Sequence, residues 1–96
     1  MWVIVTYDVS TETTEGQRRL RRVAQVCKDY GQRVQKSVFE CSLNEIQYER
    51  MKQRLLEKIN EKEDSLRLYR MSEPRDRHVE EFGCWQVIDF DEPLIV

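Results

Sequence analysis

The sequence predicts one α+β domain, and three observations lead to this fold class. The chain has 96 residues, which is enough for a single domain with one modest core. A β-branched run opens the chain, two stretches with helical periodicity follow, and β-like segments lie between and after them. No internal repeat or linker divides the chain, so we expect one domain over residues 1–96.

The first strand is expected over residues 3–9, because β-branched and aromatic side chains dominate this run. A polar loop follows at residues 10–14. Asp8 therefore lies at the carboxyl end of a core strand, a place where the sheets of α/β proteins often carry their sites.

The first helix is expected from Glu15 to Tyr30. Thr14 and Gln17 have the spacing of a capping box, and Gly31 stands where a glycine commonly follows a helix. Apolar residues recur at helical spacing and predict one buried stripe, which contains Leu20, Val23, Ala24, Cys27 and Tyr30.

The middle of the chain predicts β structure followed by a second helix. Residues 32–43 are β-like, but their alternation breaks near Lys36 and Ser37, which fits either one bent strand or a very tight hairpin. Asn44, with Gln47 three residues later, is an expected N-cap for a helix over residues 45–61.

The last third of the chain predicts further strands. Residues 64–71 alternate and predict a strand, residues 79–82 predict a short strand or a rim, and residues 85–90 predict a final strand. Within residues 84–96, the apolar end at 94–96 is expected either to dock on a partner or to pack on its own sheet. With a hairpin in the middle, the order is the ferredoxin-like βαββαβ order with an extra C-terminal strand.

The net charge of −2 hides a basic body and an acidic end. Residues 1–78 carry 16 Lys and Arg against 13 Asp and Glu, which leaves +3. Residues 79–96 carry five acidic side chains and no basic one, which leaves −5. Affinity for nucleic acid depends on local clusters of basic side chains near phosphates, so the net charge does not exclude it.

Four arginines lie near the start of the predicted first helix, at positions 18, 19, 21 and 22. At 100° per residue they cannot share one face and must cover a broad arc. Such a run is either a solvated surface or a patch that contacts phosphates, and the helix N-terminus would favour anions there.

Several classes of protein are disfavoured. No apolar run approaches the roughly 18 residues of a membrane span, and no signal peptide pattern is present, so we expect a cytoplasmic location.

Cys27, Cys41 and Cys84 are odd in number and widely spaced, which predicts reduced, semi-buried thiols. His78 lies in a charged loop and is expected to be an ordinary surface residue, with an acid–base role as the weaker alternative.

Asp8 has two interpretations. It can cap the following loop by accepting N–H bonds from Ser10 or Thr11, as Asp commonly does. It can also be a metal ligand, although Mg²⁺ prefers about six oxygen ligands and is commonly held by one or two carboxylates. In a two-fold dimer, two copies of Asp8 could hold one metal ion that activates water against a phosphodiester.

Four stretches of the sequence resemble a single protein family across nearly the whole chain. They are Val5 to Val9, Arg33 to Cys41, Asp64 to Arg70 and Ile88 to Ile95. With these motifs in this order, the chain resembles the smaller of the two universal CRISPR adaptation proteins. The resemblance implies a ferredoxin-like endonuclease or endoribonuclease.

The resemblance implies a homodimer that acts with the larger CRISPR integrase protein to capture short foreign DNA for antiviral defence. It also implies a phosphodiesterase that uses Mg²⁺, with Mn²⁺ as a possible substitute, on single-stranded RNA or double-stranded DNA. The metal-binding and catalytic position of the family falls on Asp8. The other matching motif positions are Tyr7, Arg33, Ser37 and Phe39. On electrostatic grounds, contacts with backbone phosphates are expected from Arg18, Arg19 and Arg22. Arg33 is also expected to bind nucleic acid.

Three functions remain open from the sequence. The first is a metal-dependent endonuclease that takes part in spacer acquisition. The second is a non-catalytic subunit that bridges DNA, which the basic body and the lack of a second catalytic residue favour. The third is a ribonuclease toxin built on the same fold.

Overall fold

The computed structural model describes residues 1–72 and 78–83. Its elements, in chain order, are β1 (Trp2–Asp8), α1 (Thr14–Tyr30), β2 (Gln32–Gln35), β3 (Val38–Ser42), α2 (Glu45–Lys58) and β4 (Ser65–Met71). This is the predicted α+β fold with the βαββαβ order. The expected C-terminal strand and tail at 84–96 lie outside the described residues, and residues 79–82 form no strand.

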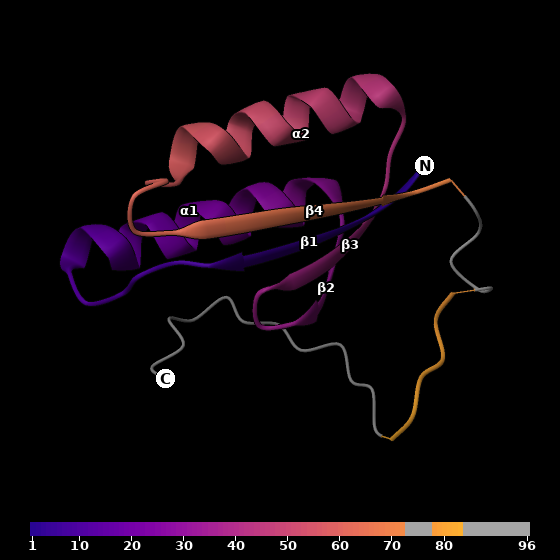
Figure 1. The fold of residues 1–96 in the computed structure, drawn as a ribbon, viewed down its shortest axis with the longest axis horizontal. Coiled ribbons are helices and arrows are strands. Elements are labelled where there is room, and N and C mark those ends of the chain that lie inside the picture. Colours follow the sequence, from indigo (N-terminus) through magenta and orange to yellow (C-terminus); the bar gives the residue numbers. More distant parts are fainter. Residues whose placement is uncertain (73–77, 84–96) are drawn as a thin grey trace.

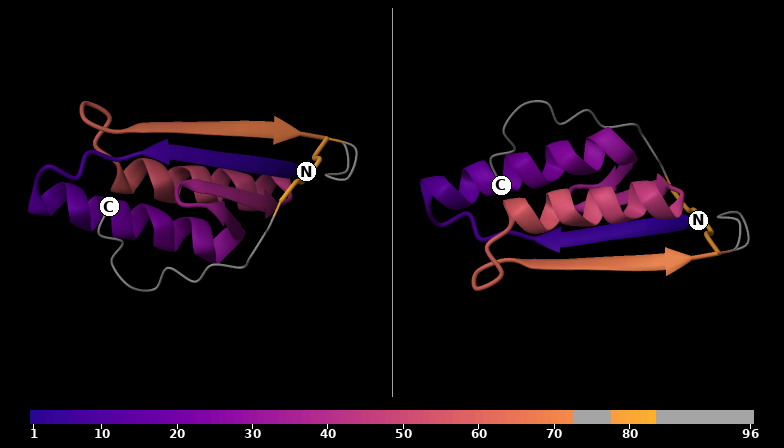
Figure 2. Two further views of the ribbon diagram at one scale, coloured as in Figure 1. Left: turned by 90° about the horizontal axis from the view of Figure 1, so that it is seen from below. Right: turned by 90° about the horizontal axis from the view of Figure 1, so that it is seen from above.

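The sheet has the strand order β2-β3-β1-β4, and every neighbouring pair is antiparallel. Figures 1 and 2 show both helices on one side of this sheet. Within the described part of the chain, no helix covers the second face of the sheet. The architecture therefore has two layers, and β1 lies between β3 and β4 at its centre.

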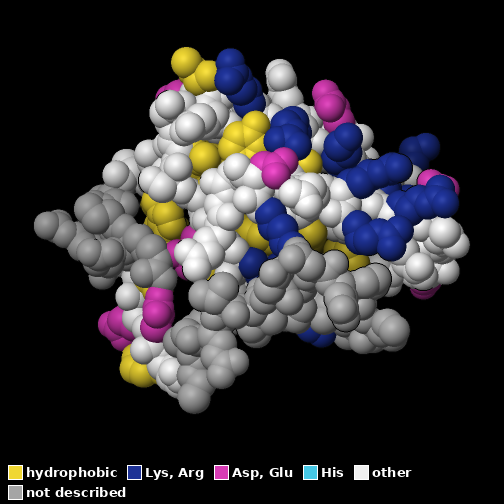
Figure 3. Space-filling view, turned by 180° about the vertical axis from the view of Figure 1, so that it is seen from behind, with side chains coloured by type: hydrophobic (Ala, Val, Ile, Leu, Met, Phe, Trp, Pro, Cys, Tyr) yellow, Lys and Arg dark blue, Asp and Glu magenta, His cyan; other side chains and the backbone are white. Residues whose placement is uncertain are grey.

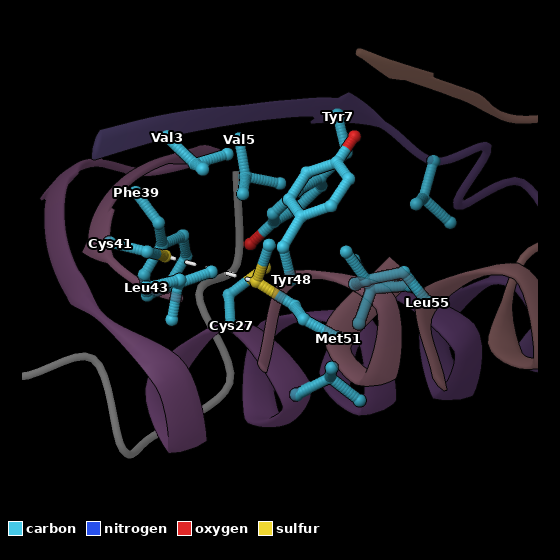
Figure 4. Close-up of a cluster of buried hydrophobic side chains, with 13 residues drawn as sticks. Val3, Val5, Tyr7, Cys27, Phe39, Cys41, Leu43, Tyr48, Met51 and Leu55 are labelled. Carbon is cyan, nitrogen blue, oxygen red and sulfur yellow. Dashed lines mark hydrogen bonds between the residues drawn. The ribbon is translucent and has the colours of Figure 1, made fainter. Parts of the chain in front are cut away.

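The core lies between the sheet and the two helices (Figure 4). Alternate residues of β1 point into it, because successive side chains of a strand face opposite sides. Its members are Val3, Val5, Tyr7, Val9, Val23, Val26, Cys27, Phe39, Cys41, Leu43, Tyr48, Met51 and Leu55. Since Val3, Val5 and Tyr7 face the helices, Asp8 follows on the helix-free face.

Two of the three cysteines belong to this core, as the sequence predicts. Both are free thiols, and the Cys41 Sγ lies 3.9 Å from the Met51 Sδ. Burial raises the pKa of Cys27 to about 12 and that of Cys41 to about 11. Both therefore stay protonated at neutral pH and act as small apolar side chains. Cys84 lies outside the described residues.

A tight hairpin joins β2 to β3, which decides between the two alternatives left by the sequence. Only Lys36 and Ser37 separate the two strands, and a bulge between Arg33 and Gln35 shifts the register. The bulge inserts one extra residue into β2, so the alternation along the sequence breaks there.

The cap of α1 is one residue earlier than predicted. Thr13, not Thr14, is the N-cap, and its Oγ1 accepts a hydrogen bond of 3.0 Å from the Gly16 N–H. The predicted capping box between Thr14 and Gln17 is therefore wrong. The Gln17 side chain instead donates to the Thr11 carbonyl at 3.4 Å.

The start of α2 is as predicted, but its end is not. Asn44 and Gln47 form the expected capping box, with hydrogen bonds of 2.8 and 2.9 Å. The helix ends at Lys58, not at Glu61. The Asn60 N–H donates to the Asp64 carboxylate at 2.8 Å. It is therefore withdrawn from the ladder of helical hydrogen bonds.

Gly16→Ala is predicted to destabilise the protein. A Cβ at position 16 would lie 1.9 Å from the Ser10 carbonyl oxygen, so the β1–α1 loop would have to move. Alanine in a helix normally stabilises by up to about 1 kcal/mol over glycine, whereas overpacking costs roughly 1–3 kcal/mol. Urea denaturation of both proteins measures the difference, with the exposed Gln53→Ala as a control. A more stable Gly16→Ala variant contradicts this packing.

Candidate metal ligand and nucleic-acid interface

Asp8 is an exposed carboxylate at the end of β1. Its register partner on the neighbouring strand β4 is Ser65. Within residues 1–72 and 78–83, its side chain forms no hydrogen bond or ion pair. The loop-capping role is absent, because the Ser10 N–H donates to Asp64. The oxygens of Asp8 therefore point out from the helix-free face and are open to a ligand.

Asp64 is a second carboxylate at the same end of the sheet, and it is buried. Its side chain is 0% exposed. It accepts four hydrogen bonds: from Ser10 N–H at 3.1 Å, from Asn60 N–H at 2.8 Å, and from Arg19 at 2.9 and 3.3 Å. An ionised carboxylate offers about four lone-pair sites, so its acceptor capacity is filled.

Arg19 is held by this carboxylate and by a second acid. Its Nε and Nη2 donate to Asp64, and its Nη2 also donates to Glu63 at 2.9 Å. Only 13% of the Arg19 side chain is exposed. The Arg19 guanidinium therefore joins α1 to the turn before β4. The structure does not present it to phosphates, although the sequence predicts such a contact for Arg19.

Acid is predicted to destabilise the fold through Asp64. Burial by itself raises the pKa of this carboxyl, but hydrogen bonds from Arg19, Asn60 and Ser10 outweigh burial and hold the pKa below its ordinary value. Because the pKa is lower in the folded state, the stabilisation is complete above the unfolded value of about 3.9. It is lost as the pH falls through the folded value.

Urea unfolding between about pH 6 and pH 2 measures this loss. Asp64→Asn should be less stable at neutral pH and should show a smaller fall in stability on acidification. Asp29→Asn is the comparison, because Arg54 and Gln25 lower the pKa of Asp29 on the exposed surface. If the stability of the wild-type protein and that of Asp64→Asn fall equally on acidification, the acid-sensitive stabilisation does not come from Asp64.

The motif residues Tyr7, Arg33 and Phe39 form a stacked group at the edge of the core. The Phe39 ring is fully buried, the Tyr7 ring lies 6.2 Å from it, and the Arg33 guanidinium lies 5.0 Å from it. Burial, with a smaller contribution from Cys27, raises the pKa of Tyr7 to about 12, although Arg33 lowers it. The phenol therefore stays neutral at working pH.

Ser37 connects this group to Asp8 through the backbone. The Tyr7 N–H donates to the Ser37 carbonyl at 3.2 Å, and the Tyr7 hydroxyl donates to the Lys36 carbonyl at 3.4 Å. The residue before Asp8 is thus fixed to the β2–β3 turn. The motif residues therefore fix the end of β1 to the β2–β3 turn. Their effect on activity stays a prediction.

Arg18, Arg21 and Arg22 are exposed on α1. Arg18 forms an exposed ion pair with Glu15 at 3.4 Å, a type that contributes little to stability. Arg21 and Arg22 form no ion pair within the described part of the chain. Figure 3 shows the helix-covered side, where Lys and Arg side chains gather toward one end. This surface has the charge that a phosphate backbone requires.

The described part of one chain does not by itself build a metal site. Among residues 1–72 and 78–83, no group of three or more His, Cys, Asp or Glu side chains is placed to hold a metal ion. The same residues contain no helix that is long and apolar enough to span a membrane. His78 is exposed, as expected for a surface residue.

Comparison with known proteins gives the family. The family described as "CRISPR associated protein Cas2" matches residues 1–79. The chain belongs to the Cas2 family. The "CRISPR-associated endoribonuclease Cas2 1" of Moorella thermoacetica is 62% identical over 96 residues, which is 100% of both chains. The "CRISPR-associated endonuclease Cas2" of Halalkalibacterium halodurans is 46% identical over 95 residues, 99% of each chain.

A solved Cas2 structure agrees with this assignment. The crystal structure of Streptococcus pyogenes Cas2 at pH 6.5 has a TM-score of 0.76 to this chain and is 53% identical. The match covers 86% of this chain and 100% of that one. The resemblance found from the sequence motifs is thus confirmed.

Asp64 is the site residue that sequence reasoning missed. The sequence predicts a strand that begins at Asp64, whereas β4 begins at Ser65. A lone acid directly before an alternating Leu66-x-Leu68 strand is a weak signal for a buried carboxylate. Its partners Ser10 and Arg19 lie 54 and 45 residues away in the sequence, so local patterns could not find them.

Proposed function

We propose that this chain is a metal-dependent endonuclease subunit that takes part in CRISPR spacer acquisition in the cytoplasm. Two copies pack through the helix-free faces of their sheets, which brings the two Asp8 carboxylates to one Mg²⁺ or Mn²⁺ ion. The larger CRISPR integrase protein and spacer-precursor DNA are the proposed partners, with single-stranded RNA as a further substrate. The observation that carries the proposal is the exposed Asp8 carboxylate, which no described residue engages.

The residues present fit such an ion. Mg²⁺ is commonly held by one or two carboxylates, with water and substrate phosphates as its other ligands. One Asp8 supplies one carboxylate, and a two-fold axis beside it supplies a second from the other copy. Relatives with 62% and 46% identity are named endoribonuclease and endonuclease, which supports a nuclease.

The chain's own residues have separate roles in the proposed reaction. Asp8 would hold the metal ion, and a bound ion would lower the pKa of a coordinated water and neutralise charge on the attacked phosphodiester. Arg18 and Arg22 bind backbone phosphates and so hold the strand over the dimer. Arg33, Tyr7, Ser37 and Phe39 keep the end of β1 in place. Tyr7 does not act as a base, because its pKa is about 12.

A non-catalytic subunit that bridges DNA is the second candidate. It is favoured by the exposed arginines of α1 and by the lack, among residues 1–72 and 78–83, of a cluster of three or more metal-binding side chains. Both functions need the phosphate contacts, but only the first needs Asp8.

Asp8→Asn is predicted to reduce Mg²⁺-dependent cleavage to the background rate without dissociating the dimer. The amide keeps the size of the side chain but loses the charge that binds the metal. Single-turnover cleavage of single-stranded RNA and double-stranded DNA measures the rate, and light scattering measures the dimer. The control is Glu12→Gln, which neutralises an exposed acid in the adjacent loop. An Asp8→Asn protein that cuts as fast as wild type would leave only the bridging function.

Charge reversal at Arg18 and Arg22 is predicted to weaken nucleic-acid binding under both functions. Two lost phosphate contacts should reduce the slope of log affinity against log salt by about 2. Fluorescence anisotropy with duplex DNA at several salt concentrations measures the slope. The matched control reverses two charges on α2, at Arg50 and Lys58. Equal loss of affinity in the two double variants would show that net charge alone, and not the α1 surface, binds the nucleic acid.

A further inference from the structure

We infer that Asp64 is a positioning residue for Asp8. Its buried carboxylate fixes the loop that follows Asp8 and the turn that precedes the partner strand β4, and so sets where the Asp8 oxygens lie in the dimer. This inference rests on the proposed function of Asp8, and it assigns a role in metal binding to a residue that itself touches neither metal nor substrate.

The first connection runs along the chain that leaves β1. Asp64 Oδ1 accepts the Ser10 N–H at 3.1 Å, only two residues after Asp8. The same loop packs against α1 at Gly16, because the lack of a side chain there lets the helix approach the Ser10 carbonyl. The backbone after Asp8 therefore has little freedom to rotate.

The second connection runs through the neighbouring strand. Ser65, the residue that follows Asp64, is the register partner of Asp8 across the β1–β4 pair. The Asp64 Oδ2 accepts the Asn60 N–H at 2.8 Å, and the Asp64 N–H donates to the Asn60 carbonyl at 2.7 Å. These two bonds close the turn before β4 and fix where that strand begins. Asp8 is thus held from its own loop and from its partner strand.

The third connection joins the loop and the turn to α1. Arg19 donates to both oxygens of Asp64, at 2.9 and 3.3 Å. All four hydrogen bonds to the carboxylate come from donors on three separate segments. A neutral Asn at position 64 has one acceptor oxygen and turns an NH₂ group toward these donors. The substitution keeps the volume but breaks part of the network.

Metal affinity is the property that this arrangement controls. Residues that orient a metal ligand typically change metal affinity by about 10- to 100-fold when they are replaced. A shared site contains two copies of Asp8, so a displaced loop misplaces both carboxylates at once. The half-saturating metal concentration should rise, whereas a high metal concentration should restore cleavage. A loss of stability that leaves the variant folded in the absence of metal would not change the half-saturating concentration.

The experiment compares Asp64→Asn with Asp29→Asn in the full-length protein. Asp29 also loses an ion pair in its variant, with Arg54 at 2.8 Å, but it joins the two helices away from the end of β1. Mn²⁺ binding is measured by electron paramagnetic resonance, and cleavage is measured across a Mg²⁺ titration. We expect Asp64→Asn to raise both half-saturating concentrations by about 10- to 100-fold, with cleavage restored at high Mg²⁺. Asp29→Asn should leave both unchanged.

A milder variant keeps the test decisive if Asp64→Asn does not fold. Arg19→Lys retains the positive charge but loses the planar fork that contacts both oxygens, so it should raise the half-saturating Mn²⁺ concentration in the same direction and by less. Wild-type metal affinity in folded Asp64→Asn would overturn the inference. If that variant does not fold, wild-type affinity in Arg19→Lys would do so.

Asp8→Asn separates this inference from the proposed function. If Asp8→Asn loses Mn²⁺ binding and folded Asp64→Asn keeps it, only the positioning role fails. If Asp8→Asn binds Mn²⁺ as tightly as wild type, the metal site at Asp8 fails, and the positioning role fails with it.

Discussion

A buried carboxylate is tolerated only where donors take up its lone pairs, and the end of the sheet that carries Asp8 depends on this condition at Asp64. Two backbone N–H groups and one guanidinium satisfy it. These donors belong to the loop after β1, the turn before β4 and the first helix. One side chain therefore decides how three segments meet, and the exposed Asp8 is positioned by groups that it does not contact.

The same network divides the arginines of α1 between structure and binding. Arg19 turns inward to Asp64 and Glu63, with 13% of its side chain exposed. Arg18 and Arg22 remain on the surface and keep their charge available to phosphates. The run of arginines is thus neither only a solvated surface nor a uniform phosphate patch. Its members differ because the helix turns by 100° at each residue.

Much of the fold could be predicted because each element carries a local signal. The alternation of β1, the apolar stripe of α1 and the capping box at Asn44 are all read within a few residues, and the structure contains all three elements. Two failures arise where Asp64 accepts a hydrogen bond from a donor that the local pattern assigns elsewhere. The second helix ends early because Asp64 accepts the Asn60 N–H, and Asp8 does not cap its loop because Asp64 accepts the Ser10 N–H.

The candidate site was predictable in part for the same reason. Asp8 is visible in the sequence because it ends a clear strand, and it lies within residues 1–79, which match the Cas2 family. Asp64 was not visible as a site residue, because its role comes from three segments that the sequence does not place together. Asp8 is exposed and Asp64 is buried. This difference follows from the fold and not from the local sequence.

If two chains share one metal ion through Asp8, the stoichiometry of metal binding reveals it. Titration of the dimer with Mn²⁺, followed by electron paramagnetic resonance, counts the tightly bound ions. We expect about one ion for every two chains in the wild-type protein and none in Asp8→Asn. One ion for every chain, or undiminished binding by Asp8→Asn, would contradict it.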